Sequence, residues 1–562
     1  MATYTLVALD TDHIKQYVFA TNKLKEIRGA SSLLDHLNRD VMDEVAKEYK
    51  AELIYANGGS GMFLVPGDKN RAEAFARAIQ REYLKQTGDG TTISFGVQEI
   101  PDSIQDVWND PALDPYMRLL HYRLLQNKGI SHQEIEVLPA HPFMRPCDAC
   151  GMRYAEDKYR GKSADPDDPE RRYCGVCLRK RKEDHNVRDG IDQLVEKKLG
   201  IGNKVINPPF AWKKLIDMLP ASYLKPNTIR PSDFNKLEGL SGGRDYMALI
   251  YADANQMGTV MDKLKTLKER QTMAEMVDTA IYQAMSQAVV RHLPIVRGEN
   301  KDEYMFPFDI LLIGGDDVMV VTPANVAIDV ALTLATEFHE ATNKQHTLSI
   351  AVIISPIKYP FGLLHELAET TLKRAKKEAA ERENKAQERG KREEFDMSTI
   401  NFVVVAGNTG HDFNKVMEPL SRENKDEGTK FYATLRPYSV EELEELREAI
   451  RIGKERDLGH TKLHQLREAV MKKNLTTSVS DARAVLTNWK EKQWQHVYSY
   501  VYQVASRYGK QHKIHEKPVS GLPRMRFPWF EDGEGVYRSP LLDFAELYDF
   551  IEQKGGNGGT KN

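Results

Sequence analysis

The same order of predicted elements occurs twice in this chain, and this repetition constrains the fold more than any other feature. Each copy reads as strand, helix, strand, Gly-Gly turn, strand, helix, strand and helix, which indicates an internal duplication. A β-α-β-β-α-β unit is typical of the ferredoxin-like arrangement, so the fold class is α+β. In chain order, the matching segments of the two copies are 4–10 and 244–258, 51–66 and 308–323, 70–86 and 325–343, 91–100 and 347–356, 115–129 and 361–383.

At 562 residues the chain is too long for one compact core, so we expect several domains. Leu, Ile, Val and aromatic residues recur at helical spacing in the last part of the chain, which predicts a helical bundle. The expected domains are a first ferredoxin-like domain, a zinc-binding helical or linker domain, a second ferredoxin-like domain and a C-terminal helical domain, at 1–139, 140–240, 241–410 and 411–562.

All four cysteines lie in one window, as Cys147-x-x-Cys150 and Cys174-x-x-Cys177. The pairs are separated by 23 residues, a spacing typical of a zinc ribbon, in which each pair supplies two thiolates to one tetrahedral ion. Disulfides or a redox site are the alternative, but the sequence shows no secretion signal. Since cysteine fills all four positions, we predict a structural Zn²⁺ with no open position for catalysis.

The formal net charge is only −3, so no global basic field points to nucleic acid or to a membrane surface. The basic run 178–182 is more typical of a solvated face than of a binding patch. Asp10 interrupts the apolar N-terminal run, and no segment approaches the roughly 18 to 20 apolar residues that a membrane span needs. We therefore expect a cytoplasmic protein without a membrane partner.

The stretch Gly314-Gly315-Asp316-Asp317 reads on its own as an ordinary hairpin turn. Its flanks are strongly apolar, however, so the strands belong in the middle of a sheet, where adjacent carboxylates repel each other. A divalent cation commonly compensates such repulsion. Asp253 ends the first strand of the same unit, beside the hairpin, so three carboxylates suited to Mg²⁺ or Mn²⁺ are expected to converge.

A helix is expected to open directly after Asp253, and its free N–H groups can hold phosphates. Asn255 and Gly258 lie in that opening segment, and glycine permits close approach of a ligand. Lys376, on the last helix of the unit, could reach the same phosphates. Together with Gly314 and Gly315 these residues predict a nucleotide-binding site, and the carboxylates predict nucleotidyl transfer assisted by metal ions.

The first copy keeps Asp10 at the end of its first strand but carries Ser60 and Gly61 where we place the two aspartates of the second copy. We interpret it as a non-catalytic partner that helps to hold a second nucleotide through its glycine turn. The segment 28–32, Arg-Gly-Ala-Ser-Ser, could take part, although simple helix packing explains it slightly better.

At this point the sequence resembles a known family, the large polymerase-like subunit of type III CRISPR effector complexes. The matching parts are LDTDHIKQYVFATNKLKEIRGASSLL, the double CxxC, YADANQMG, IGGDD, the AKKE helix and LRPYSVEEL, and their order matches the family. GGDD alone is not specific, whereas its combination with a duplicated unit and a zinc ribbon is.

The resemblance implies two palm domains and a cyclase that converts ATP to cyclic oligoadenylate, an antiviral second messenger, when an effector complex with guide RNA binds target RNA. It implies that Asp253, Asp316 and Asp317 are catalytic and bind Mg²⁺ or Mn²⁺, with Gly314 and Gly315 under the nucleotide. Many members begin with a His-Asp phosphohydrolase domain. Because the first palm strand starts at residue 4, no DNA cleavage is expected from this chain.

Three alternatives stay open. A diguanylate-cyclase-like enzyme shares the Gly-Gly-acid turn, although that class needs neither a second palm nor a zinc ribbon. A catalytically silent scaffold that binds guide RNA and protein subunits is disfavoured by the intact acids of the second copy. A template-dependent polymerase is disfavoured because the sequence shows no obvious basic groove.

Overall fold

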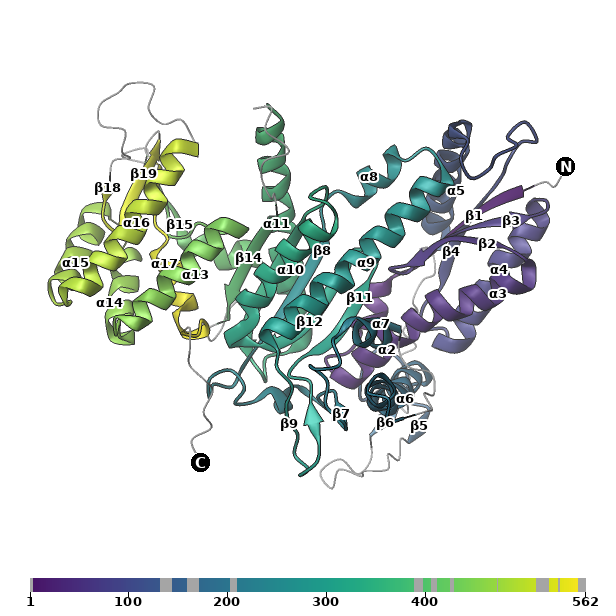
Figure 1. The fold of residues 1–562 in the computed structure, drawn as a ribbon, viewed down its shortest axis with the longest axis horizontal. Helices are drawn as coiled ribbons and strands as arrows, with labels where there is room; N and C mark the ends of the chain where they lie inside the picture. Colours follow the sequence, from purple (N-terminus) through teal and green to yellow (C-terminus); the bar gives the residue numbers. More distant parts are fainter. Residues whose placement is uncertain are drawn as a thin grey trace.

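The structure is a computed structural model, and it describes most of the chain. The described residues are 4–131, 144–158, 171–202, 210–388, 398–405, 412–424, 429–472, 474–511, 525–533 and 536–553. The molecule is elongated, with the first palm at one end, the second palm in the centre and the C-terminal domain at the other end (Figure 1). No described helix combines the length and the apolar character that a membrane span requires.

The first palm is a four-stranded antiparallel sheet in the order β2-β3-β1-β4, as a ferredoxin-like unit requires. Its helices include α2, which continues through a π-helical turn into α3. The strands are β1 (Tyr4–Thr11), β2 (Glu52–Asn57), β3 (Ser60–Pro66) and β4 (Ile93–Glu99), and the helices are α1 (Ile14–Val18), α2 (Leu24–His36), α3 (Met42–Tyr49), α4 (Lys69–Thr87) and α5 (Asp114–Ser131).

The second palm repeats this order as β11-β12-β8-β13 and extends the sheet by β14 and β17. The duplication expected from the sequence is therefore confirmed. The strands are β8 (Tyr246–Ala254), β11 (Asp309–Gly314), β12 (Asp317–Pro323), β13 (Leu348–Pro356), β14 (Thr399–Val404) and β17 (Tyr438–Ser439), and the helices are α8 (Met257–Lys263), α9 (Leu267–His292), α10 (Ala327–Ala341) and α11 (Phe361–Glu388).

The two faces of the central sheet belong to different cores, because side chains alternate along a strand. From β8, Ile250 and Ala252 pack with α9 and α10, whereas Leu249 and Tyr251 pack with α11 and the first palm. Asp253 continues the second series. The strand register therefore turns Asp253 toward the interface between the two palms.

The middle segment joins the two palms. Here α6 (Gly175–Lys198) follows a small hairpin and packs along α2 of the first palm. Its remaining elements are β5 (Asp157–Lys158), β6 (Arg172–Tyr173), α7 (Phe210–Met218) and β7 (Thr228–Ile229). Strand β7 forms a three-stranded sheet with β10 (Tyr304–Met305) and β9 (Val296–Arg297), which lie between α9 and β11 of the second palm.

The C-terminal domain is mainly helical, as expected, but it also contains a five-stranded sheet that was not predicted from the sequence. Its helices are α12 (Phe413–Met417), α13 (Val440–Glu455), α14 (His460–Val470), α15 (Leu475–Thr487), α16 (Glu491–Gln511) and α17 (Leu541–Leu547). Its strands are β15 (Ser421–Asn424), β16 (Thr429–Tyr432), β18 (Met525–Arg526), β19 (Trp529–Gly533) and β20 (Val536–Arg538).

Candidate nucleotidyl-transfer site

The Gly314-Gly315 pair closes the β11–β12 hairpin. Gly314 pairs with Asp317 across the turn, and Gly315 has a φ of +63°, in the left-handed region that favours glycine. The turn thus delivers Asp316 at its tip and Asp317 at the start of β12. The ordinary hairpin and the metal scaffold proposed from the sequence are the same structural element.

Asp253 lies directly beside this turn. Strand β8 pairs with β12 so that Asp253 is opposite Asp317, and the backbone N–H of Ala254 donates to the carbonyl of Asp316 at 3.2 Å. A central strand therefore ends in one carboxylate where the neighbouring hairpin supplies two more. This juxtaposition is the one expected from the sequence.

Burial and mutual repulsion disfavour the charged forms of Asp316 and Asp317. Burial, followed by the charge of Asp253, raises the pKa of Asp316 to about 6. The same two causes raise the pKa of Asp317 well above its usual range, and Asp317 Oδ1 is buried without a hydrogen-bond partner. On the opposite side, Lys376 Nζ forms an ion pair of 2.5 Å with Asp253 Oδ2. Buried, mutually repelling oxygen ligands with an unsatisfied acceptor fit a divalent cation.

The aspartates are nevertheless not as tightly clustered as the cysteines. Within the described ranges, Cys147, Cys150, Cys174 and Cys177 are the only group of three or more His, Cys, Asp or Glu residues whose ligand atoms all lie within 4.8 Å of one another. The lysine bound to Asp253 instead occupies part of the space around that carboxylate. A cation bound by all three aspartates would therefore compete with Lys376 for the Asp253 carboxylate.

Asn255 and Gly258 lie where the chain leaves β8 and enters α8. The Asn255 side chain donates to Thr347 Oγ1 at 2.8 Å and accepts from Ser349 Oγ at 2.6 Å, so its amide is held by the start of β13 and the residue before it. Gln256 takes a left-handed conformation before α8 begins. Gly258 is exposed, and a Cβ atom there would meet nothing within 4 Å. The predicted nucleotide contacts of Asn255 and Gly258 remain predictions.

The first palm places different residues at its turn from those we aligned by sequence. Asn57 pairs with Ser60 just as Gly314 pairs with Asp317, and Gly58 takes the left-handed conformation of Gly315. Gly59 and Ser60, rather than Ser60 and Gly61, therefore correspond to the two aspartates, which corrects our alignment by one residue. The conclusion that this copy has lost both carboxylates stands.

Other polar contacts of the second palm have counterparts in the first. The Asp12 carboxylate accepts from Thr92 Oγ1 at 2.6 Å and from Ser94 Oγ at 2.8 Å, as the amide of Asn255 is held in the second palm. Lys128, on α5, forms an ion pair with Asp10. No motif marks this lysine in the sequence, although the duplication could have indicated it from the position of Lys376 on the last helix.

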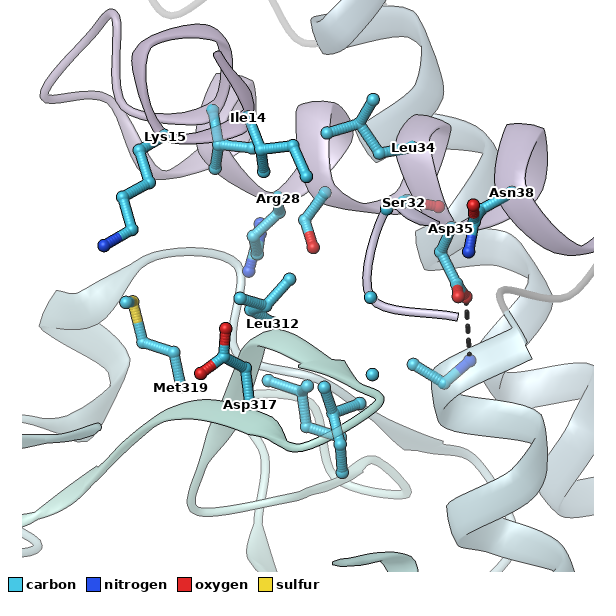
Figure 2. Close-up of a pocket in the computed structure, with 18 of the residues that line it drawn as sticks. Ile14, Lys15, Arg28, Ser32, Leu34, Asp35, Asn38, Leu312, Asp317 and Met319 are labelled. Atoms are coloured by element: carbon cyan, nitrogen blue, oxygen red, sulfur yellow. Dashed lines mark hydrogen bonds between the residues drawn. The ribbon is translucent and has the colours of Figure 1, made fainter. Parts of the chain in front are cut away.

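The glycine turns of the two palms meet. A Cβ atom on Gly314 would lie 3.5 Å from the backbone nitrogen of Gly58, and one on Gly315 would lie 3.6 Å from its Cα. Beside this contact a cavity of about 160 Å³ opens between the palms. Figure 2 shows that Lys15 and Ser32 of the first palm and Asp317 of the second lie around the same space.

In the segment 28–32, Arg28 has a packing role, whereas contact of this segment with a nucleotide stays a prediction. Arg28 is buried and donates to Asp184 Oδ1 at 3.0 Å, to Asp309 Oδ2 at 2.6 Å and to the carbonyl of Pro231 at 2.7 Å. It thereby ties α2 to α6 and to the second palm. Ser31 and Ser32 line the cavity.

The four cysteines are free thiols with the geometry of a zinc site. Cys150 Sγ and Cys174 Sγ are 4.0 Å apart, close to the separation of about 3.8 Å expected for a tetrahedral ion with Zn–S bonds near 2.3 Å. The four residues therefore fit Zn²⁺. The nearby basic run is less solvated than expected, because Lys180 is fully buried and its ammonium group donates to the carbonyl of Tyr17.

Comparisons with known proteins agree with this arrangement. Residues 246–386 match the family described as Cas10/Cmr2, second palm domain. The fold resembles crystal structures of the Csm1-Csm4 cassette in complex with cA4, with pppApApA and with one ATP, at TM-scores of 0.53, 0.51 and 0.50. The identities are 12%, 13% and 14%, over 98%, 98% and 85% of this chain and 70%, 70% and 64% of the matched chains. No curated protein matches the sequence.

Proposed function

The chain is Cas10-like in its second palm domain and in its fold, and we propose that it is a metal-dependent nucleotidyl cyclase that converts ATP to cyclic oligoadenylate. The observation that carries this proposal is the placement of Asp253 opposite Asp317 at a Gly-Gly turn that faces the cavity between two palms. Solved structures of the same fold bind ATP and cA4. They support adenine nucleotides as the substrate class.

In this proposal Asp253, Asp316 and Asp317 hold Mg²⁺ or Mn²⁺. When bound, the metal ions would lower the pKa of the attacking hydroxyl and neutralise charge on the triphosphate and the leaving pyrophosphate. Gly314 and Gly315 would lie under the nucleotide, as the family resemblance implies. Lys376, released from Asp253, would pair with phosphate instead.

The first palm has no carboxylates at its turn, so its part in the proposal is to close the site from the other side and to hold a second nucleotide through Gly58 and Gly59. We further propose that the protein works within a type III effector complex containing guide RNA, and that target RNA activates it. The Csm1-Csm4 cassettes support association with a further protein subunit.

The test is mass spectrometry of products formed by the full chain from mixed nucleoside triphosphates with Mg²⁺ or Mn²⁺. The Asp316→Ala/Asp317→Ala variant serves as the control. Cyclic oligoadenylates from the wild type alone would support the reaction, the base and the site. Guanine cyclic dinucleotides would instead favour the diguanylate-cyclase-like alternative. If the wild type neither binds ATP nor forms product, alone or with effector subunits and target RNA, the scaffold interpretation replaces the cyclase.

A further inference from the structure

The first palm contributes a lysine to the wall of the cavity opposite Asp317 of the second palm. We propose that Lys15 binds the phosphates of the nucleotide held by Asp253, Asp316 and Asp317, and that Glu369 holds the Lys15 ammonium group while no nucleotide is bound. This inference rests on the proposed function and assigns one residue of the first palm to phosphate binding.

The position of Lys15 comes from the short helix α1, which follows the first strand of the first palm. Lys15 and Asp317 both line the cavity and extend from opposite walls of it (Figure 2). Lys15 Nζ lies 5.9 Å from the centre of the Tyr251 ring. Tyr251 precedes Asp253 by two residues in β8 and therefore shares its face of the sheet. The ammonium group thus lies on the side of the sheet that bears the carboxylates.

Among the cavity-lining residues, Lys15 differs from the other basic side chains, Arg28 and Arg230, in its exposure to solvent. Both arginines are buried and ion-paired with Asp184. Lys15 is 59% exposed, and its ion-pair partner Glu369 is 34% exposed. An exposed pair of this kind adds little stability, typically about 0–1 kcal/mol. Exchange of Glu369 for a phosphate therefore requires little energy, whereas Arg28 could not be withdrawn without leaving a buried charge unpaired.

A purely structural role, in which the Lys15–Glu369 pair latches the palms together, is the competing explanation. Other contacts already join α11 to the segment that directly follows α1: Phe19 stacks on His365 with ring centres 3.8 Å apart, and the Gly362 N–H donates to Asn22 Oδ1 at 2.6 Å. The interface therefore does not depend on the exposed ion pair. The site, by contrast, offers three carboxylates and needs cations to receive a triphosphate.

The experiment measures binding by calorimetry on the full chain with Mg²⁺, using α,β-methylene-ATP as an unreactive triphosphate and adenosine as a phosphate-free probe. Lys15→Gln should lower the affinity for the triphosphate analogue about tenfold to a hundredfold, which is the range for loss of a charged hydrogen bond. The affinity for adenosine should not change. Lys15→Arg should restore most of the affinity. Glu369→Gln should leave the analogue's affinity equal or higher, because it frees the ammonium group.

Lys47→Gln is the matched control, because Lys47 is also exposed and paired with an aspartate, Asp43, but lies on α3 outside the cavity lining. If Lys15→Gln binds the analogue like the wild type, the Lys15 inference is wrong while the proposed function survives. If Lys15→Gln and Glu369→Gln lower the affinity for both probes equally, the ion pair has only a structural role between the palms and the inference is also wrong. A wild type that binds neither probe would overturn the proposed function itself.

Discussion

Replacing Asp316 by asparagine should stabilise the protein while abolishing nucleotide transfer. In the absence of a metal ion, burial and the charge of Asp253 raise the pKa of Asp316 from 3.8 to about 6. A carboxyl group with a raised pKa binds its proton more tightly in the folded state than in the unfolded state. The folded protein therefore loses stability as the pH rises through this interval.

The size of the effect follows from the two pKa values. A difference of about two units between the pKa of Asp316 in the folded and in the unfolded state lowers the free energy of unfolding by about 3 kcal/mol when the carboxyl group is ionised. This loss of folding stability is below about 1 kcal/mol near pH 4, grows between pH 4 and 6, and reaches its full size above roughly pH 7. Asp316→Asn removes the ionisable group, so its advantage over the wild type should grow over the same interval.

Thermal unfolding in metal-free buffer at pH 5 and pH 8 measures this directly. Since about 1 kcal/mol shifts Tm by roughly 2–4 °C in a domain of this size, the variant should melt about 5 °C or more above the wild type at pH 8. The difference in Tm between the variant and the wild type should be about half as large at pH 5. Added Mg²⁺ should raise the Tm of the wild type more than that of the variant. Asp302→Asn, at an exposed carboxylate of the same palm, is the control.

A variant that is no more stable than the wild type at pH 8, with the same pH dependence, would refute the reasoning. It would mean that Asp316 does not lie charged in a crowded, poorly solvated position. Equal Mg²⁺ responses of the two proteins would separately contradict the assignment of Asp316 as a metal ligand.

Two further predictions concern the scaffold. Cys174→Ser should lower the bound zinc from one ion per chain, measured by elemental analysis, and destabilise the middle domain, because the metal contributes folding energy; a zinc-free wild type would contradict the ribbon. Gly29→Ala should cost about 1–3 kcal/mol in thermal unfolding, because its Cβ would lie 1.7 Å from the carbonyl oxygen of Lys180 where α2 crosses α6. Gly258→Ala, in open space, is its control, and equal melting of the two would oppose the packing argument.

The parts of the site that the sequence predicted are those set by local pattern. An apolar run that ends in Asp253 predicts a buried strand with a polar end, and Gly314-Gly315 between two apolar runs predicts the hairpin. Once the duplicated unit fixes the sheet order, the approach of the two follows. The cysteine spacing likewise carries its own geometry, and the structure gathers the four thiols.

The parts that the sequence did not predict depend on register or on distant partners. The first palm has glycines at 58, 59 and 61, and the sequence does not say which of them takes the position of Gly315; pairing of Asn57 with Ser60 decides it. The strands of the C-terminal sheet are short and come from distant segments, so no periodicity marks them. The contact of Arg28 with Asp309 joins residues 281 positions apart.

The two palms differ at the start of the helix that follows their first strand. His13 and Gln256 both take a left-handed conformation just before α1 and α8, with φ of 51° and 58°. The two helices therefore begin in the same way, and their second residues are Lys15 and Gly258. The palm that lacks the two turn carboxylates has a cation at this position, whereas the palm that keeps them has a glycine with open space around it.

This exchange has a direct consequence for a ligand between the palms. A triphosphate at Asp317 would meet three carboxylates and one lysine, Lys376, on the side of the second palm. Further positive charge from the other side would therefore favour its binding. The lysine of the first palm supplies it across the cavity, on a helix whose start is built like that of α8. If Lys15 binds the triphosphate as proposed, the first palm serves the site through the helix that it presents to the second palm, although its turn lacks the two aspartates.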